Sequence, residues 1–125
     1  MTRHDIDTVR TNAVLLNTIA EKISDLERII ELRGINFKRE KELTDLKATY
    51  ELIESNERRA QLKNLITQSK LTPMQKTIFY EYYINGKTAK AVGADCCLCV
   101  REIYNRLCEA RHNLGIYGSC RKNQL

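Results

Sequence analysis

The chain is poor in the residues that interrupt helices. Its 125 residues include one proline, five glycines and no tryptophan, whereas Leu, Ile, Glu, Lys, Arg and Ala are abundant. Proline and glycine are the least favourable residues in a helix interior, so this composition is typical of a mostly or wholly helical protein. We therefore expect an all-α fold, built as one domain or as a small domain with an extended helical element.

Hydrophobic runs of membrane length are also missing. The sequence has no stretch of about 18 apolar residues, which a transmembrane helix would require. The N-terminus carries Arg3 and His4 but continues with Asp5 and Asp7 in place of an apolar segment, so it is not a secretory signal. We predict a cytoplasmic protein without a membrane partner.

The sequence contains no signature of catalysis. The tripeptide Gly86-Lys87-Thr88 lacks the preceding strand and the further glycine of a phosphate-binding loop. The only histidines are His4, at an end that we expect to fray, and His112, which is typical of a helix-end surface residue. We predict that the protein is not an enzyme and has no cofactor.

Charge is divided unevenly along the chain. Residues 1–69 contain 12 Lys/Arg and 12 Asp/Glu, whereas residues 70–125 contain 9 Lys/Arg and 4 Asp/Glu. The whole positive excess therefore lies in the C-terminal half. A balanced, strongly charged segment suits a solvated helix with ion pairs, and a small basic domain is attracted to phosphate.

Apolar residues in the N-terminal half recur at the spacing of coiled-coil helices. The first stripe is Val9, Leu16, Ile19, Ile23, Leu26 and Ile30. The second is Leu43, Leu46, Tyr50 and Ile53, and its spacing continues through Glu57 and Ala60. Gly34, between them, marks a helix end. The pattern predicts two helices, as a hairpin or as one long bent rod. We expect a homodimer to cover the first stripe; the alternative is that the helices wrap the C-terminal part of the same chain.

A capped boundary separates the two halves. Thr72 fits the N-cap, Pro73 the first helical position and Gln75 the third, which together predict a capping box. We therefore divide the chain into a coiled-coil or oligomerisation region (1–69), a helix-turn-helix domain (70–118) and a flexible tail (119–125).

Residues 87–115 have the layout of a short helix, a tight turn and a longer basic helix. Thr88 caps the first helix, Gly93 lets the second helix cross it closely, and Leu98 fills the turn. Apolar residues of the second helix fall at spacings of 3 and 4, at Val100, Ile103, Leu107, Ala110 and Leu114. Its polar flanks are then available to a ligand, and a duplex major groove admits such a helix.

This arrangement resembles region four of bacterial sigma factors over residues 71–115. The resemblance is carried by Leu71, Thr72, Pro73, Phe79, Tyr82, Tyr83, Gly86, Thr88, Val92, Val100, Ile103, Arg106, Leu107, Ala110, Arg111 and Leu114. A helical N-terminal half before a lone domain of this kind is similar to the phage and prophage regulators of the ArpU and RinA type. The resemblance implies DNA binding and activation of phage genes. The chain departs from the family pattern at Gly93, at Cys97, where glycine is usual, and at Arg101-Glu102-Ile103.

We expect the helix from about Cys99 to Asn113 to enter the major groove. The side chains expected near base edges are Arg101, Glu102, Tyr104 and Asn105, since Arg and Asn pair best with bases. The side chains expected at phosphates, which position the protein without specifying sequence, are Lys87, Thr88, Lys90, Arg106 and Arg111.

Five cysteines lie in the last 30 residues, at positions 96, 97, 99, 108 and 120. A zinc site made of Cys96 or Cys97 with Cys99, Cys108 and His112 is one interpretation, and a thiol redox switch near basic residues is another. The spacing fits no closed zinc motif. We expect reduced structural cysteines and no metal.

Together these features predict a sequence-specific regulator of transcription that binds double-stranded DNA, is encoded by a phage or prophage and is dimeric. One alternative is a protein–protein adaptor that docks on RNA polymerase or another partner. A second is a small terminase-like subunit for DNA packaging, although in that class the DNA-binding part usually comes first.

Overall fold

A computed structural model describes residues 1–116, which fold into six α-helices with no strand among them. The helices are α1 (Arg3–Arg33), α2 (Phe37–Glu54), α3 (Glu57–Gln68), α4 (Pro73–Tyr83), α5 (Ala89–Cys96) and α6 (Val100–Asn113). The predicted all-α class is confirmed for this part of the chain. The tail predicted at 119–125 lies outside the described residues.

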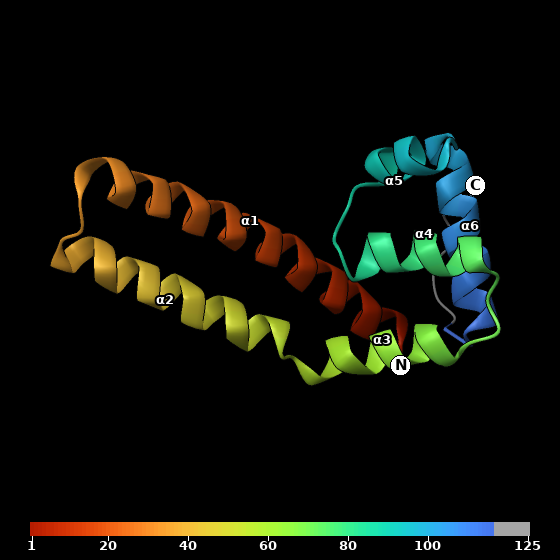
Figure 1. Ribbon diagram of the computed structural model, residues 1–125. Coiled ribbons are helices and arrows are strands. Elements are labelled where there is room, and N and C mark those ends of the chain that lie inside the picture. Colours follow the sequence, from red (N-terminus) through yellow and green to blue (C-terminus); the bar gives the residue numbers. More distant parts are fainter. Residues whose placement is uncertain (117–125) are drawn as a thin grey trace.

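Helices α1 and α2 run antiparallel, side by side, and form an arm that projects from the other helices (Figure 1). Gly34 ends α1 with a positive φ of 82°, a conformation that glycine adopts without strain. The side chain of Asn36 then caps α2 by accepting a hydrogen bond of 2.9 Å from the backbone N–H of Arg39. Across the arm, Lys47 Nζ lies 3.5 Å from Glu27 Oε2.

The apolar stripe of α1 is largely covered inside the chain. Leu16, Ile19 and Leu26 are buried because α2 packs along that side of α1. Ile23 and Ile30 are only half-buried. The stripe is therefore not open along its length to a second copy, which corrects the expectation that it serves as the dimer seam.

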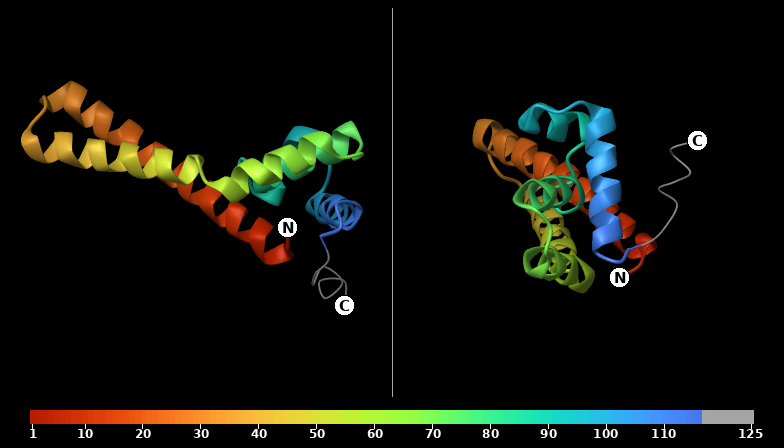
Figure 2. Two further views of the ribbon diagram at one scale, coloured as in Figure 1. Left: turned by 90° about the horizontal axis from the view of Figure 1, so that it is seen from below. Right: turned by 90° about the vertical axis from the view of Figure 1, so that its right-hand side faces the viewer.

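A short break separates α2 from α3, although the sequence pattern continued across it. The side chain of Asn56 accepts hydrogen bonds from the backbone N–H groups of Arg58, at 3.0 Å, and Arg59, at 3.3 Å, and so begins a new helix. The chain turns at this point (Figure 2). Leu62 and Ile66 of α3 consequently reach the core of the C-terminal helices.

The hydrophobic core lies where the first turns of α1 meet α3, α4, α5 and α6. Its buried members are Ile6, Val9, Leu62, Ile66, Leu71, Ile78, Phe79, Tyr83, Ile84, Ala89, Val92, Ile103, Leu107, Ala110 and Ile116. These residues come from both sides of the boundary expected at 69/70. Helices α1 and α3 are therefore structural parts of the C-terminal bundle, and the division of functions between residues 1–69 and 70–118 stays a prediction.

The N-terminus is capped, so the fraying expected there is wrong. Thr2 Oγ1 accepts from the backbone N–H of Asp5 at 3.2 Å, and Asp5 Oδ2 accepts from the backbone N–H of Thr2 at 2.9 Å. These hydrogen bonds lower the pKa of Asp5. The capping box holds the turn that carries Ile6, a fully buried core residue.

The capping box predicted for α4 is confirmed. Thr72 Oγ1 accepts from the backbone N–H of Gln75 at 3.2 Å, and Gln75 Oε1 accepts from the backbone N–H of Thr72 at 3.1 Å. Pro73 occupies the first turn, where its missing N–H costs no helical hydrogen bond. Local chemistry thus sets the start of α4 independently of the core behind it.

Candidate nucleic-acid interface

Helices α5 and α6 meet through a turn with two special backbone positions. Cys97 ends α5 in the left-handed conformation, with φ of 60°, and is the one non-glycine residue of the described chain with positive φ. A Cβ atom on Gly93 would lie 2.5 Å from the carbonyl oxygen of Leu98, so only glycine permits this crossing. The N–H of Leu98 donates to the carbonyl of Gly93 at 2.9 Å. The turn therefore fixes the start of α6 against α5.

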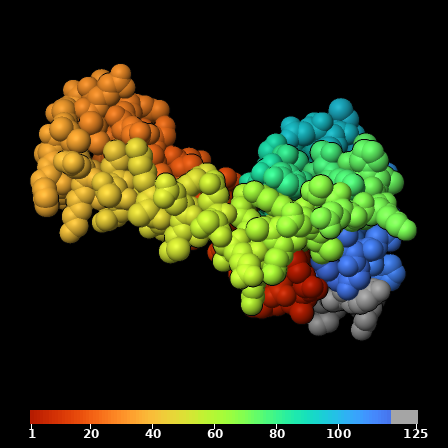
Figure 3. Space-filling model, turned by 60° about the horizontal axis from the view of Figure 1, so that its bottom comes forward, coloured from red at the N-terminus to blue at the C-terminus, as the bar shows by residue number. Residues whose placement is uncertain are grey.

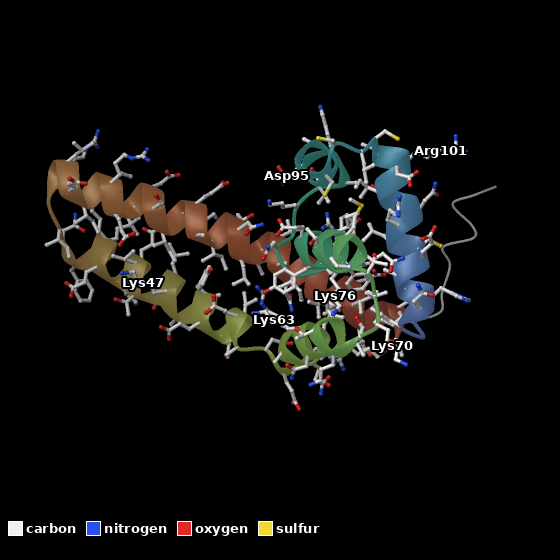
Figure 4. The ribbon with its side chains drawn as sticks, turned by 45° about the vertical axis from the view of Figure 1, so that its right-hand side comes forward. Lys47, Lys63, Lys70, Lys76, Asp95 and Arg101 are labelled. Carbon is white, nitrogen blue, oxygen red and sulfur yellow. The ribbon has the colours of Figure 1, made fainter. Side chains whose placement is uncertain are left out.

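Helix α6 has an apolar face on the core and a polar face directed outward. Ile103, Leu107 and Ala110 are at most 1% exposed, whereas Arg101 and Asn105 lie on the exposed side, within the first two turns. Figure 4 shows Arg101 extending away from the body of the protein at the start of α6. These two predicted base-contacting residues are thus available to a ligand.

Tyr104 is exposed on the same outward side of α6 as Arg101 and Asn105. Its ring meets the ring of Tyr82 from α4 edge-on, with centroids 6.4 Å apart, and half of Tyr104 remains accessible. The remaining predicted base contact, Glu102, is half-buried and accepts a hydrogen bond of 3.0 Å from Arg106 Nε. Glu102 and Arg106 therefore neutralise each other, and neither offers an unpaired charge.

Arg111 does not lie on the outward face, so its prediction as a phosphate contact is wrong. Its side chain is 5% exposed, because position 111 falls one turn after Leu107 on the inward side of α6. Arg111 Nη1 donates to Tyr83 Oη at 2.8 Å. Burial in turn raises the pKa of Tyr83. This pair is a buried polar contact of the core.

The predicted phosphate contacts before and within α5 differ in availability. Lys87 Nζ lies 2.6 Å from Glu81 Oε2 and 3.0 Å from Asp95 Oδ2, and its contacts with these carboxylates raise the pKa of Lys87. Thr88 Oγ1 caps α5 by accepting from the backbone N–H of Ala91 at 3.1 Å. Lys90 is exposed and makes no ion pair within the described residues.

Two acidic residues that the sequence analysis did not single out lie close to this face. Glu109 is exposed one turn beyond Asn105 on α6, and Asp95 is exposed near the end of α5 (Figure 4). The spacing of four residues between Asn105 and Glu109 indicates, from the sequence alone, that Glu109 lies on the same side of α6 as Asn105. Within helices α5 and α6, the exposed cations without an ion pair are Lys90 and Arg101, so the positive charge of the face is concentrated at few positions.

Arg10 of α1 holds the segment between α4 and α5 by its carbonyl groups. Arg10 Nη1 donates to the carbonyl of Tyr82 and, at 2.9 Å, to that of Lys87. Its guanidinium also lies 3.6 Å from the centre of the Tyr82 ring, within the range of a cation–π interaction. No sequence pattern indicates this role, because 72 residues separate Arg10 from Tyr82.

Further contacts from α1 and α3 hold the same segment. Asn17 Nδ2 donates to the carbonyl of Asn85 at 2.9 Å, and Arg59 Nη1 donates to the carbonyl of Ile84 at 2.7 Å. Gly86 lies so close to α1 that a Cβ atom on it would be 3.0 Å from the backbone of α1. The φ of Gly86 is 70°, which also favours glycine. The position of α5 is therefore set by α1 and α3 as well as by the turn before α6.

The cysteines near the turn form no metal site in the described part of the chain. Cys96, Cys97 and Cys99 are free thiols, and no group of three or more His, Cys, Asp and Glu side chains within residues 1–116 is arranged to hold a metal ion. Cys108 is half-buried on α6. Cys120 lies outside the described residues.

None of the helices within residues 1–116 combines the length and the hydropathy needed to cross a membrane. No protein-family model, curated protein or solved structure matches the chain. Function is therefore inferred from the side chains of α5 and α6 and from the contacts that position them.

Proposed function

We propose that the protein binds double-stranded DNA sequence-specifically through α6 and regulates transcription, as a product of a phage or prophage. The observation that carries the proposal is the exposure of Arg101, Tyr104 and Asn105 within the first two turns of α6, directly after a tight turn from α5. In helix-turn-helix proteins the first residues of the second helix contact base edges in the major groove. The regulatory role follows from the resemblance of residues 71–115 to sigma region four.

The side chains have distinct roles in this proposal. Arg101 suits a bidentate contact to guanine, and Asn105 suits one to adenine. Lys90 neutralises a backbone phosphate, and Thr88 lies at the start of α5, where backbone N–H groups favour an anion. The hydrogen bonds of Arg10 to the segment before α5 hold Thr88 and Lys90 in a fixed position relative to the rest of the bundle.

Selection of bound duplexes from a random pool, with the full-length protein, is the direct test. We expect enrichment of a defined motif. Arg101→Ala and Asn105→Ala should each cost about 1–3 kcal/mol on the selected site and relax preference at one base pair. Arg101→Lys keeps the charge but loses the planar pair of donors, so it should lose specificity while retaining non-specific binding.

A control outside the interface separates readout from general damage. Lys47, on the arm and paired with Glu27, lies far from Arg101 (Figure 4), and Lys47→Ala should leave binding unchanged. Lys90→Ala should weaken all sequences alike, with a smaller salt dependence, since each phosphate contact contributes about −0.9 to the slope of log affinity against log salt. Absence of any enriched motif at low salt would refute DNA recognition.

The second candidate function is a protein–protein adaptor that docks on RNA polymerase. The observation that favours it is the small number of unpaired cations on α5 and α6, beside the exposed carboxylates of Asp95 and Glu109. A DNA-binding face normally has a clearer positive excess. Binding of the purified protein to RNA polymerase without DNA, abolished by Tyr104→Ala, would support this function in place of the first.

A further inference from the structure

The end of the arm exposes more apolar surface than a free monomer usually does. Four large apolar side chains, Ile29, Leu32, Ile35 and Phe37, fall within the nine residues 29–37, which we call the arm tip. Leu32 is 78% exposed and Phe37 is 82% exposed. Exposed large apolar side chains gathered in one short segment are a candidate interaction site. In Figure 3 the arm and the C-terminal bundle form two lobes, and the tip is the part of the arm farthest from the bundle.

The apolar seam of the arm is also incompletely covered. Leu43, Leu46, Tyr50 and Ile53 of α2 recur at alternating spacings of three and four, yet α2 has no buried residue. Helical bundles bury such stripes completely when further helices pack against an antiparallel pair. Within one chain the stripe of α2 is therefore only half-buried.

Two adjoining grooves lie beside the tip. One, of about 610 Å³, has Leu26 and Ile29 among its lining residues, between α1 and α2. The other, of about 450 Å³, runs along α2 beside Phe37 and Leu46. Lys38 and Glu42 line both grooves, so the two are parts of one surface. A protruding aromatic ring beside grooves that hold apolar side chains among charged ones suits pairing of a surface with its own copy.

We propose that the arm tip and its grooves form the interface of a homodimer, in which Phe37 of each copy enters the groove beside Ile29 of the other. A two-fold axis brings identical patches together, so the patch must be complementary to itself. The proposal names the partner for the proposed DNA-binding function and rests on that function for its purpose, since one recognition helix reads only a few base pairs.

Charge favours a second copy over nucleic acid at the arm tip. Residues 21–54 contain 7 Lys/Arg and 9 Asp/Glu, and charges of both signs line the groove between α1 and α2, at Lys22, Asp25, Lys38 and Glu42. A two-fold axis can therefore pair opposite charges without a net repulsion. Nucleic acid would favour an excess of positive charge, which lies instead in residues 70–125.

Sedimentation or light scattering of the full-length protein without DNA tests the interface. We expect a mass of twice 14.5 kDa at micromolar concentration. Phe37→Glu and Leu32→Glu should each weaken dimerisation at least tenfold, because burial of an unpaired charge opposes association. Both side chains are mostly exposed, so helicity should not change. Leu52→Glu is the matched control: Leu52 is 75% exposed on α2 but lies outside the arm tip and lines neither groove, so dimerisation should persist.

The outcomes separate this proposal from the DNA-binding one. A wild-type monomer at about 100 µM, a concentration at which even a weak dimer forms, would overturn the interface whatever the protein does with DNA. A dimer that persists with both tip substitutions would also overturn the interface. So would a wild-type monomer whose arm tip binds purified RNA polymerase. If the dimer forms through the tip and no duplex is selected, the interface stands and the DNA-binding proposal fails.

Discussion

Replacing Gly93 by alanine tests whether the turn between α5 and α6 requires the absence of a side chain. The added Cβ would lie 2.5 Å from the carbonyl oxygen of Leu98 and 3.5 Å from Cγ1 of Ile103. Cβ atoms essentially never approach other heavy atoms within 3.0 Å, so the turn must move by at least half an ångström. The neighbour is backbone, and no side-chain rotation relieves the contact.

One stabilising and two destabilising terms decide the sign of the effect. Alanine is favoured over glycine inside a helix by about 0.8–1.0 kcal/mol. Overpacking of a close contact typically costs about 1–3 kcal/mol, and opening the turn weakens the hydrogen bond from Leu98 to Gly93, worth about 1 kcal/mol. We therefore expect Gly93→Ala to lower the free energy of unfolding by about 1–3 kcal/mol, or the thermal midpoint by roughly 4–12 °C.

Urea unfolding followed by circular dichroism gives the measurement. Ala91→Gly is the matched control, because position 91 is exposed on the same short helix and reports the propensity term alone, about 1 kcal/mol of destabilisation. If Gly93→Ala were neutral or stabilising while Ala91→Gly destabilised as expected, the crossing of α5 and α6 would not be as close as described, and the basis for placing α6 would be wrong.

Three further predictions follow from the same region. Cys97→Gly should raise stability by about 1 kcal/mol, since a left-handed residue with a side chain is strained by about that amount, whereas Cys97→Val should lower it in the same urea assay. Arg10→Leu should cost about 2 kcal/mol by leaving carbonyls without their charged donor, whereas the exposed Arg28→Leu should be neutral. Burial raises the pKa of Tyr83, so its contribution to stability is complete below about pH 10 and is lost as the pH rises through the folded-state pKa. Tyr83→Phe should reduce that alkaline loss while costing about 1–2 kcal/mol at pH 7 through Arg111; an unchanged alkaline profile would count against the burial.

Local chemistry made several features predictable from the sequence. The caps at Thr72 and Thr88 depend on residues within three positions of each other, and the close approach at Gly93 depends on the crossing of two neighbouring helices. Leu98 packs against the core, as its place in the turn predicted. Cys97 has a positive φ because it ends α5, after which the chain must change direction within three residues.

Features that depend on distant segments were not predictable in the same way. Periodicity placed α1 in a coiled coil, yet Ile6 and Val9 join the core of the C-terminal helices, because a long helix can serve different neighbours along its length. The break at Asn56 was hidden because Glu57 and Ala60 continue the repeat. Arg111 was assigned to the surface by its charge, although its position after Leu107 places it inward; only the hydroxyl of Tyr83 makes that burial tolerable.

The position of α6 relative to the arm follows from the continuity of α1. The first turns of α1 belong to the core, Arg10 and Asn17 hold the segment before α5, and the same helix continues to the arm tip without a break. A helix of 31 residues is about 46 Å long at 1.5 Å per residue. Because no flexible linker separates the tip from the bundle, two copies joined at the tip would hold their α6 helices at a fixed distance. The spacing of the half-sites would then be set by α1, a helix that itself contacts no base.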